Sequence, residues 1–377
     1  MSETGKGVKE LFEEVINQGL CTGCGACITG CPYLVDHEGR IVLMDKCTGG
    51  DGDCYKHCPR TFLDRDAISR TVFGSSYDDG EIGQFLEIFM ARSKDPEIRK
   101  RGQDGGTVTG LLVMAMEEGL IDVAACTRMN EEKVPRGYLA HSRSELLHCA
   151  GSSYEACLAL QAYRSLPKDN LEKIAIVGRG CQIEAVGKMK QIQPQNSPDP
   201  KNIKLSLGLI CGWALSPSSF HPYLKEICEL SNVSKFDIPH TPHYSFDVHF
   251  NNHPDTMSLP LDKIKPFINP ACWFCWDMTA EFSDISVGSA GAEFPGWNTV
   301  IVRSPVGSKL VLLANRKGIL ETRSLPNHRL ENLKKAALKR KNAAYENIVQ
   351  KTGNDEDLLY LRTLPGSIAE RYSGKNE

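Results

Sequence analysis

The sequence predicts an α+β protein in which a small cysteine-rich module precedes a larger core that mixes strands and helices. Seven of the 15 cysteines fall within residues 21–58, a stretch too short to build a sizeable apolar core of its own. Beyond residue 85, short apolar runs typical of buried strands alternate with amphipathic helical stretches. These changes divide the chain into a module (residues 1–72), a core (73–325) and a C-terminal helix and tail (326–377).

The module is expected to begin with a short amphipathic helix over residues 6–18, where apolar residues recur at helical spacing. The helix leads into four cysteines that read Cys21-x2-Cys24-x2-Cys27-x3-Cys31-Pro32. This is the bacterial ferredoxin pattern, in which three thiolates bind one [4Fe–4S] cluster and the fourth binds a neighbouring cluster. A structural zinc site is the alternative. The spacing favours iron–sulfur binding, and therefore electron transfer.

The second cysteine group of the module is irregular. It reads Cys47-x6-Cys54-x3-Cys58-Pro59, so one cysteine is missing and one residue has been added. Ferredoxin pairing predicts that the ligands of the first cluster are Cys21, Cys24, Cys27 and Cys58. The second cluster would then have Cys31, Cys47 and Cys54. Its fourth ligand stays open: Asp51 or Asp53 could supply an oxygen, a three-iron cluster could form, or the site could be empty.

Composition narrows the functional class. The formal net charge is −3 and the sequence pI is about 6.4, which gives no reason to expect nucleic acid or an anionic membrane as a partner. The sequence has no run of 18 apolar residues, so we predict no membrane span, and the N-terminus lacks signal-peptide features. So many cysteines without a secretory signal favour metal binding over disulfides, and we expect a cytoplasmic protein.

The core is predicted from segments that alternate between short apolar runs, typical of strands, and apolar residues at helical spacing. Short apolar runs bounded by turn residues predict buried strands, and longer runs at helical spacing predict helices. The expected strands are Phe85–Met90, Ile121–Thr127, Ile174–Val177, Ile203–Ile210, Ile285–Val287, Val300–Arg303 and Lys309–Leu313, with antiparallel strands within 244–268. The expected helices are Thr107–Glu118, Tyr154–Tyr163, Glu184–Lys190, Ser219–Leu230 and residues 328–351.

Two small-residue loops precede predicted helices of the core. The segment Gly102-Gln103-Asp104-Gly105-Gly106-Thr107 opens directly into the helix at Thr107. Glycines let a backbone approach a phosphate closely, and a helix N-terminus favours negative charge. Gly151-Ser152-Ser153-Tyr154 has the same character. Each loop could equally be a turn or a helix cap.

Four further cysteines suggest another redox site. Cys181 and Cys211 each end a predicted strand, and Cys272 and Cys275 form a C-x2-C pair. Four thiols suffice for a [4Fe–4S] cluster, with zinc or ordinary buried cysteines as the alternatives. The remaining cysteines of the core, which lie in apolar or helical segments, are interpreted as packing residues: Cys126, Cys149, Cys157 and Cys228.

In this order the segments resemble the β-subunit family of coenzyme F420-dependent hydrogenases and dehydrogenases, over about residues 85–305. That family includes β subunits of F420-reducing hydrogenase and formate dehydrogenase and the input subunits that oxidise reduced F420. Hydroxymethyl chlorophyll reductases are also similar. The matching segments are 101–112, 151–154, 176–182, 208–211, 272–281, 284–288 and 296–303. Only some members carry an N-terminal ferredoxin module.

The resemblance implies an FAD held by the loop of residues 102–109 and neighbouring backbone. It implies a [4Fe–4S] cluster on Cys181, Cys211, Cys272 and Cys275. The fold class it implies is a two-cluster ferredoxin-like module followed by a mixed α/β flavin-binding core. The residues expected at the cofactor are Gly102, Gln103, Asp104, Gly105, Gly106, Thr107, Thr109, Gly151, Ser152, Ser153, Tyr154 and Arg179. Arg179 is a departure, since many members have Thr-Pro before the cluster cysteine.

The expected activity is hydride exchange between F420 and FAD, followed by single-electron transfer through the clusters. The partner would be a hydrogenase, formate dehydrogenase or heterodisulfide-reductase-like subunit. One alternative keeps the cofactors but uses NAD(P)H, ferredoxin or a tetrapyrrole, although no G-x-G-x-x-G motif follows a predicted strand. The other alternative is a non-catalytic electron-transfer adaptor. We predict no side chain as general acid or base, since hydride transfer does not require one.

Overall fold

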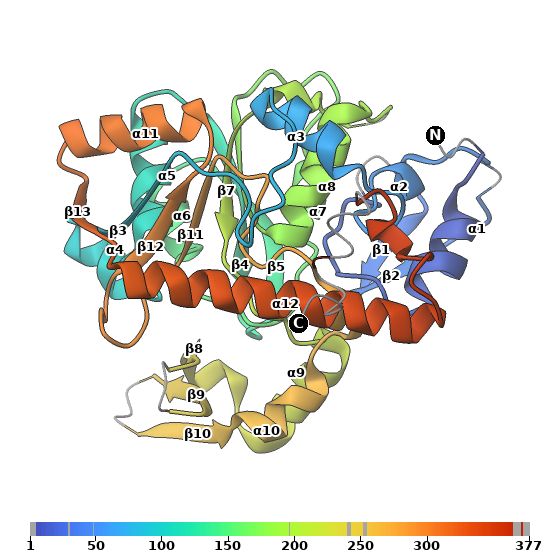
Figure 1. Ribbon diagram of the computed structural model, residues 1–377. Coiled ribbons are helices and arrows are strands. Elements are labelled where there is room, and N and C mark those ends of the chain that lie inside the picture. Colours follow the sequence, from blue (N-terminus) through green and yellow to red (C-terminus); the bar gives the residue numbers. More distant parts are fainter. Residues whose placement is uncertain are drawn as a thin grey trace.

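The computed structural model describes residues 5–28, 31–47, 49–195, 197–239, 243–251, 255–364 and residue 371. This part of the chain contains an eight-stranded sheet, a three-stranded sheet and a two-stranded hairpin. Figure 1 shows the large sheet with helices on both sides, the N-terminal module beyond the helices on one of these sides, and the small sheet set apart below. The mixed α/β core and the preceding small module agree with the predicted order of parts.

The N-terminal module has few regular elements. Its first helix is α1 (Val8–Leu11), which continues as a π-helix over Phe12–Ile16 and so confirms the predicted amphipathic helix. A hairpin of β1 (Leu34–His37) and β2 (Arg40–Leu43) follows the first cysteine loop. The short helix α2 (Asp53–Lys56) carries Cys54, and α3 (Arg65–Phe73) leads out of the module. The apolar face of the first helix packs against the cysteine loops.

The large sheet has the strand order β13-β3-β12-β11-β7-β6-β4-β5. Strands β11, β7, β6 and β4 run parallel in the middle, and the outer pairings are antiparallel. The bounds are β3 (Glu87–Ser93), β4 (Val123–Met129), β5 (Pro135–Ala140), β6 (Ile174–Arg179), β7 (Ile203–Leu209), β11 (Ile285–Ser289), β12 (Asn298–Val302) and β13 (Leu320–Ser324). Because parallel strands end at one edge, the residues that follow β6 and β7 lie close together.

Helices cover the large sheet and link it to the small one. Those of the core are α4 (Pro96–Arg101), α5 (Thr107–Glu117), α6 (Arg143–His148), α7 (Gln161–Arg164), α8 (Gly180–Gln191) and α11 (Pro305–Arg316). The small sheet consists of β8 (Val233–Asp237), β9 (Ser245–Phe250) and β10 (Thr256–Pro260), accompanied by α9 (Pro217–Ile227) and α10 (Leu261–Ile264). Short 3-10 turns lie at Pro200–Asn202, Leu230–Asn232, Lys265–Phe267, Pro270–Phe274 and Leu359–Leu361. Among the described helices, none is long and apolar enough to cross a lipid bilayer.

Two predicted elements of the core are wrong. The segment Lys309–Leu313 lies in α11 and is not a strand. The Ser304 side chain accepts a hydrogen bond from the Gly307 N–H and caps this helix, with Pro305 at its first turn, and these signals outweigh a short apolar run. The segment Tyr154–Tyr163 is helical only from Gln161, because the preceding residues run extended and bridge to Leu215.

The C-terminal helix α12 (Asn327–Thr352) spans 26 residues and runs along the molecule from the core to the N-terminal module (Figure 1). Its Lys341 is buried, and the ammonium group lies 2.9 Å from the Glu281 carboxylate and donates to the Gly80 carbonyl at 2.8 Å. Glu281 also accepts from Arg65 of α3 at 3.2 Å and from the Tyr77 hydroxyl at 2.5 Å. Helix α12, α3 and the loop before β11 therefore share one buried ionic network. The three-part division of the chain stays a prediction.

We expect Lys341→Met to destabilise the protein by about 3 kcal/mol, because it removes one partner from a buried ion pair. The matched control is Lys339→Met on the same helix, where the side chain is exposed and a change within about 0.5 kcal/mol is expected. The measurement is the free energy of unfolding in urea under anaerobic conditions. Equal effects of the two substitutions would contradict the role given to the network.

Candidate functional site

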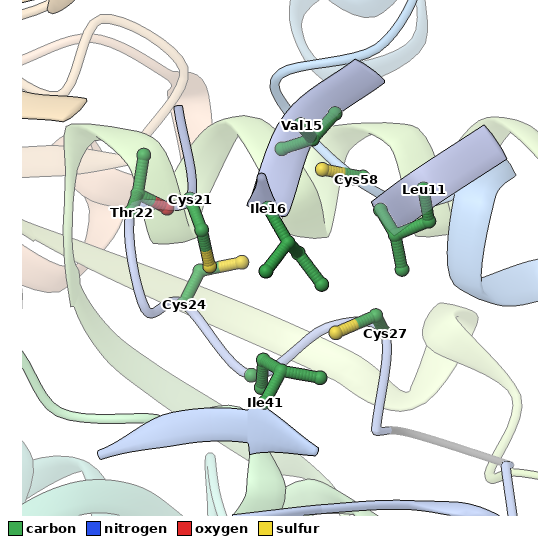
Figure 2. A pocket seen from close by; sticks show the side chains of 10 residues that line it. Leu11, Val15, Ile16, Cys21, Thr22, Cys24, Cys27, Ile41 and Cys58 are labelled. Atoms are coloured by element: carbon green, nitrogen blue, oxygen red, sulfur yellow. The ribbon is translucent and has the colours of Figure 1, made fainter. Parts of the chain in front are cut away.

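The four cysteines predicted for the first cluster line one pocket. Cys21, Cys24 and Cys27 come from the loop after the first helix, and Cys58 follows α2. Figure 2 shows their side chains around this pocket together with apolar neighbours. The apolar part of the lining consists of Leu11, Val15, Ile16 and Ile41. The structure thus brings together the ligand set that ferredoxin pairing predicts, beside apolar side chains.

The electrostatics of this pocket fit a cationic group bound by thiolates. Burial, together with the nearby thiols of Cys58 and Cys181, raises the pKa of Cys21 to about 11. Burial also raises the pKa of Cys24, with Cys58 and Cys181 adding to the effect. Buried thiolates need positive charge among them, and the iron of a cluster would supply it.

Four thiols line this pocket, which is the number that binds a [4Fe–4S] cluster. Within the described residues, no group of three or more His, Cys, Asp or Glu side chains is placed to hold a metal ion. The preference for an iron–sulfur cluster over zinc therefore rests on the spacing of the cysteines.

The structure also gathers the three thiols of the irregular group. Burial raises the pKa of Cys54 to about 12, with contributions from the neighbouring Cys31 and Cys47. The two candidate oxygen ligands are engaged elsewhere: Asp51 lies 2.7 Å from the Lys56 ammonium, and Asp53 accepts a hydrogen bond from the Gln195 N–H at 2.7 Å. The occupancy and fourth ligand of this second site stay predictions.

The third group of cysteines assembles at the edge where parallel strands end. Cys181 lies in the first turn of α8, directly after β6, and Cys211 follows β7. Cys272 lies in the turn at Pro270–Phe274, where its sulfur accepts the Ala214 N–H at 3.4 Å, and Cys275 closes that turn. A Cβ at Gly180 would lie 2.6 Å from the Asp277 carbonyl oxygen, so only glycine allows α8 to approach the segment after this turn so closely.

The members of this third group influence one another electrostatically. Burial raises the pKa of Cys211 to about 12. The charge of Arg179 opposes this shift, and the thiols of Cys272 and Cys181 add to it. Cys275 has the same neighbours Cys181 and Cys272, and burial raises its pKa as well. Cys181 also raises the pKa of Cys21 and Cys24, so the third group lies beside the first. Two groups of thiols are therefore adjacent inside the protein.

The glycine-rich loop is shaped first by its own packing. Gly106 has φ of +68°, which favours glycine, and a Cβ at Gly105 would lie 2.7 Å from the Asn298 Oδ1 atom. Asn298 accepts the Thr107 N–H at 3.2 Å and the Thr107 hydroxyl at 2.8 Å, so a side chain of β12 caps α5. Two of the glycines are thus explained by close contacts within the chain. Gly102 caps α4, and Thr109 lies buried in the first turns of α5.

The two predicted cofactor loops meet at the end of β8. Gln103 donates a hydrogen bond to the Asp237 carboxylate, and the Tyr154 hydroxyl accepts the Ile238 N–H at 3.1 Å. Burial raises the pKa of Tyr154, and the charges of Asp237 and Asp104 act in the same direction, with Ser152 bonded to its hydroxyl. Sequence reasoning missed Asp237 and Ile238, because nothing local marks them; only the tertiary fold brings the small sheet to the loops.

Two of the predicted cofactor residues carry unused hydrogen-bonding atoms. In the described part of the chain, the buried Ser153 hydroxyl and the Nη2 atom of Arg179 have no hydrogen-bond partner. The Arg179 backbone N–H donates to Gln182 at 2.8 Å, which fixes the start of α8. Burial opposes the Arg179 charge, but nearby thiols including Cys181 and Cys211 keep its pKa raised. Buried donors of this kind usually contact a polar group, so the residues fit a cofactor such as FAD.

A buried acid–base pair next to this loop was not predicted. The Nδ1 atom of His221, on α9, lies 3.8 Å from the Oε1 atom of Glu155, and both side chains are nearly excluded from solvent. Across the described residues, neither the Glu155 carboxylate oxygens nor the ring nitrogens of His221 have a hydrogen-bond partner. Burial raises the pKa of Glu155, while His221 opposes the shift. The two residues are 66 positions apart in sequence, so no local sequence pattern predicts that they pair.

The fold and the three cysteine groups indicate an iron–sulfur protein that transfers electrons. Comparison with known families agrees: a 4Fe–4S binding domain matches residues 14–35. The N-terminal and C-terminal parts of the coenzyme F420 hydrogenase/dehydrogenase β subunit match residues 88–164 and 171–328. The chain belongs to this β-subunit family, as its sequence motifs predicted. It is an F420-linked oxidoreductase that transfers electrons.

Individual relatives support this assignment. The chain is 31% identical to the coenzyme F420 hydrogenase subunit beta of Methanothermobacter thermautotrophicus, over 71% of this chain and 95% of the relative. It is 29% identical to the coenzyme F420-dependent sulfite reductase of Methanocaldococcus jannaschii, over 96% of this chain but only 56% of that protein. A chain of the F420-reducing [NiFe] hydrogenase complex of Methanosarcina barkeri has a TM-score of 0.65 and 26% identity, covering 72% of this chain and 93% of that one.

We expect Cys181→Ser to reduce the iron content by about one four-iron cluster per chain, because it removes a thiolate from the third group. Cys228→Ser is the matched control, since this thiol lies apart from the three groups and donates to the Leu224 carbonyl at 3.5 Å. Iron per chain is measured after anaerobic reconstitution. Equal iron contents in the two variants would contradict a cluster on Cys181.

Proposed function

We propose that this protein exchanges hydride between coenzyme F420 and a bound FAD, and passes single electrons through its clusters to or from a partner redox subunit. The observation that carries the proposal is the position of the third cysteine group. Its thiols adjoin Arg179, which has an unused buried donor, and also the cysteines of the ferredoxin module. FAD, when bound, would supply the step between two-electron and one-electron chemistry.

The residues expected to hold FAD come from the two small-residue loops and from Arg179 at the end of β6. The N-terminus of α5 offers a favourable potential to a phosphate, although Asn298 already accepts the Thr107 N–H. Ser153 and Arg179 would donate to polar atoms of the cofactor, which their unused donors support. Arg179 also lies beside the thiols of Cys181, Cys211 and Cys272. One guanidinium group would thus contact the flavin site and the cluster site together.

The electron path would leave through the ferredoxin module. The first cysteine group adjoins the third, and the irregular group with Cys31 and Cys47 is partly exposed. Tyr33 and Met44, which flank these two cysteines, are 40% and 68% exposed. An exposed apolar rim next to a redox site suits a protein partner. We propose that the partner is a hydrogenase, formate dehydrogenase or heterodisulfide-reductase-like subunit, as the hydrogenase complex of the structural relative suggests.

The proposal is tested by adding reduced F420, NADH or NADPH separately to the anaerobic protein reconstituted with FAD and iron–sulfur clusters. Flavin bleaching by reduced F420 alone is the expected result. Bleaching by a nicotinamide instead would assign a different donor to the same cofactors. A protein that retains no flavin, or a flavin inert to all three donors, would overturn hydride exchange in favour of an electron-transfer adaptor.

We expect Ser153→Ala to weaken FAD binding by roughly fivefold, because a hydrogen bond to the cofactor is worth about 1 kcal/mol. The flavin-free protein should not lose stability, since the hydroxyl has no partner among the described residues. Ser231→Ala, at an exposed position, is the control. Dissociation constants come from fluorescence titration with FAD. A loss of stability without a loss of FAD affinity would remove Ser153 from the site.

A further inference from the structure

Arg60 lies between the first and third cysteine groups. It follows Cys58 by two residues, and its side chain is 1% exposed. Its Nη1 atom donates to the Glu184 carboxylate at 3.0 Å and to the Pro59 carbonyl at 3.3 Å. The guanidinium stacks over the Tyr360 ring at 4.2 Å from the ring centre. These contacts leave the side chain no freedom to turn away from the interior.

The contacts of Arg60 place it beside both groups. Its partner Glu184 lies on α8 three residues after Cys181. The Tyr360 ring under the guanidinium is held at Cys275, because its hydroxyl donates to the Phe274 carbonyl at 2.7 Å and accepts the Trp276 N–H at 3.1 Å. One buried cation is therefore shared by two sites that lie on different parts of the sequence.

Arg60 is only partly neutralised, and one of its hydrogen-bond donors has no partner among the described residues. Glu184 is shared between Arg60 and Arg65, whose Nη1 atom lies 2.6 Å from the other carboxylate oxygen, so one carboxylate faces two guanidinium groups. The Nε–H of Arg60 has no acceptor among the described residues. A buried donor next to thiolates can bond to a cluster sulfur, and such bonds raise the reduction potential of a cluster.

We propose that Arg60 is a positioning residue of the electron path, whose guanidinium stabilises the reduced state of the clusters in the first and third groups together. Each cluster gains one negative charge when it accepts an electron, and a fixed cation in a low-dielectric interior favours that state. The shared cation would therefore raise the reduction potentials of both clusters. This inference rests on the cluster assignments of the proposed function.

The test compares reduction potentials of the clusters in the reconstituted protein, followed by EPR during an anaerobic redox titration. In Arg60→Met, both reduction potentials should fall by at least about 59 mV. For a one-electron couple this shift is a tenfold change in the ratio of reduced to oxidised cluster. Arg60→Lys keeps the charge and should retain most of the wild-type potentials. Arg70→Met is the control in the same module, because Arg70 is exposed and pairs with Asp66 at 2.7 Å.

A second variant covers the case in which Arg60→Met fails to assemble its clusters. Glu184→Gln removes the carboxylate that offsets Arg60, and both potentials should then rise. Unchanged potentials in the assembled variants, or a shift confined to one cluster, would overturn the shared role of Arg60. Iron content of the wild-type protein is measured first. A wild-type protein without two clusters would refute the cluster assignments, whereas intact clusters with unchanged potentials would refute only the role of Arg60.

Discussion

The Glu184 carboxylate accepts hydrogen bonds from Arg60 and Arg65, and all three side chains are almost completely excluded from solvent. Loss of any partner from such a group would leave a buried charge uncompensated. Glu184 lies on α8 three residues after Cys181, whereas Arg60 lies two residues after Cys58. The ion pair therefore fixes the cysteine-rich module on the core at the place where the two sets of thiols adjoin. Lys188 of α8 supports this docking by donating to the Cys58 carbonyl at 2.8 Å, and the proposed electron path depends on these contacts.

The edge of the large sheet provides the second constraint. Strands β6 and β7 run parallel, so Cys181 and Cys211 emerge at the same edge without any local sequence signal that joins them. Arg179, the last residue of β6, faces the thiols from this edge. The loop with Ser153 reaches the neighbouring end of β8 through Tyr154. The hydride chemistry and the one-electron chemistry that we propose would thus share one edge of the fold.

The predictable parts of the site are those set by local spacing. The run from Cys21 to Cys31 fixes its own loop geometry, and the pocket with Cys58 agrees with ferredoxin pairing. The positions of Cys181 and Cys211 at strand ends were visible because buried strands carry apolar runs. Order along the chain then identified the family. The short run at Lys309–Leu313 was misread because five apolar-rich residues fit a strand and a helix equally well, and the capping residue decides.

The residues that could not be predicted act across long sequence separations. Arg60 pairs with Glu184 over 124 positions, and Gln103 contacts Asp237 over 134 positions. A single sequence offers periodicity and spacing, and neither identifies which buried charge meets which. The same limit applies to the glycine loop, where the close approach of Asn298 from a distant strand requires Gly105. Cofactor ligands can be inferred from spacing, but the side chains that tune them become visible only after the chain has folded.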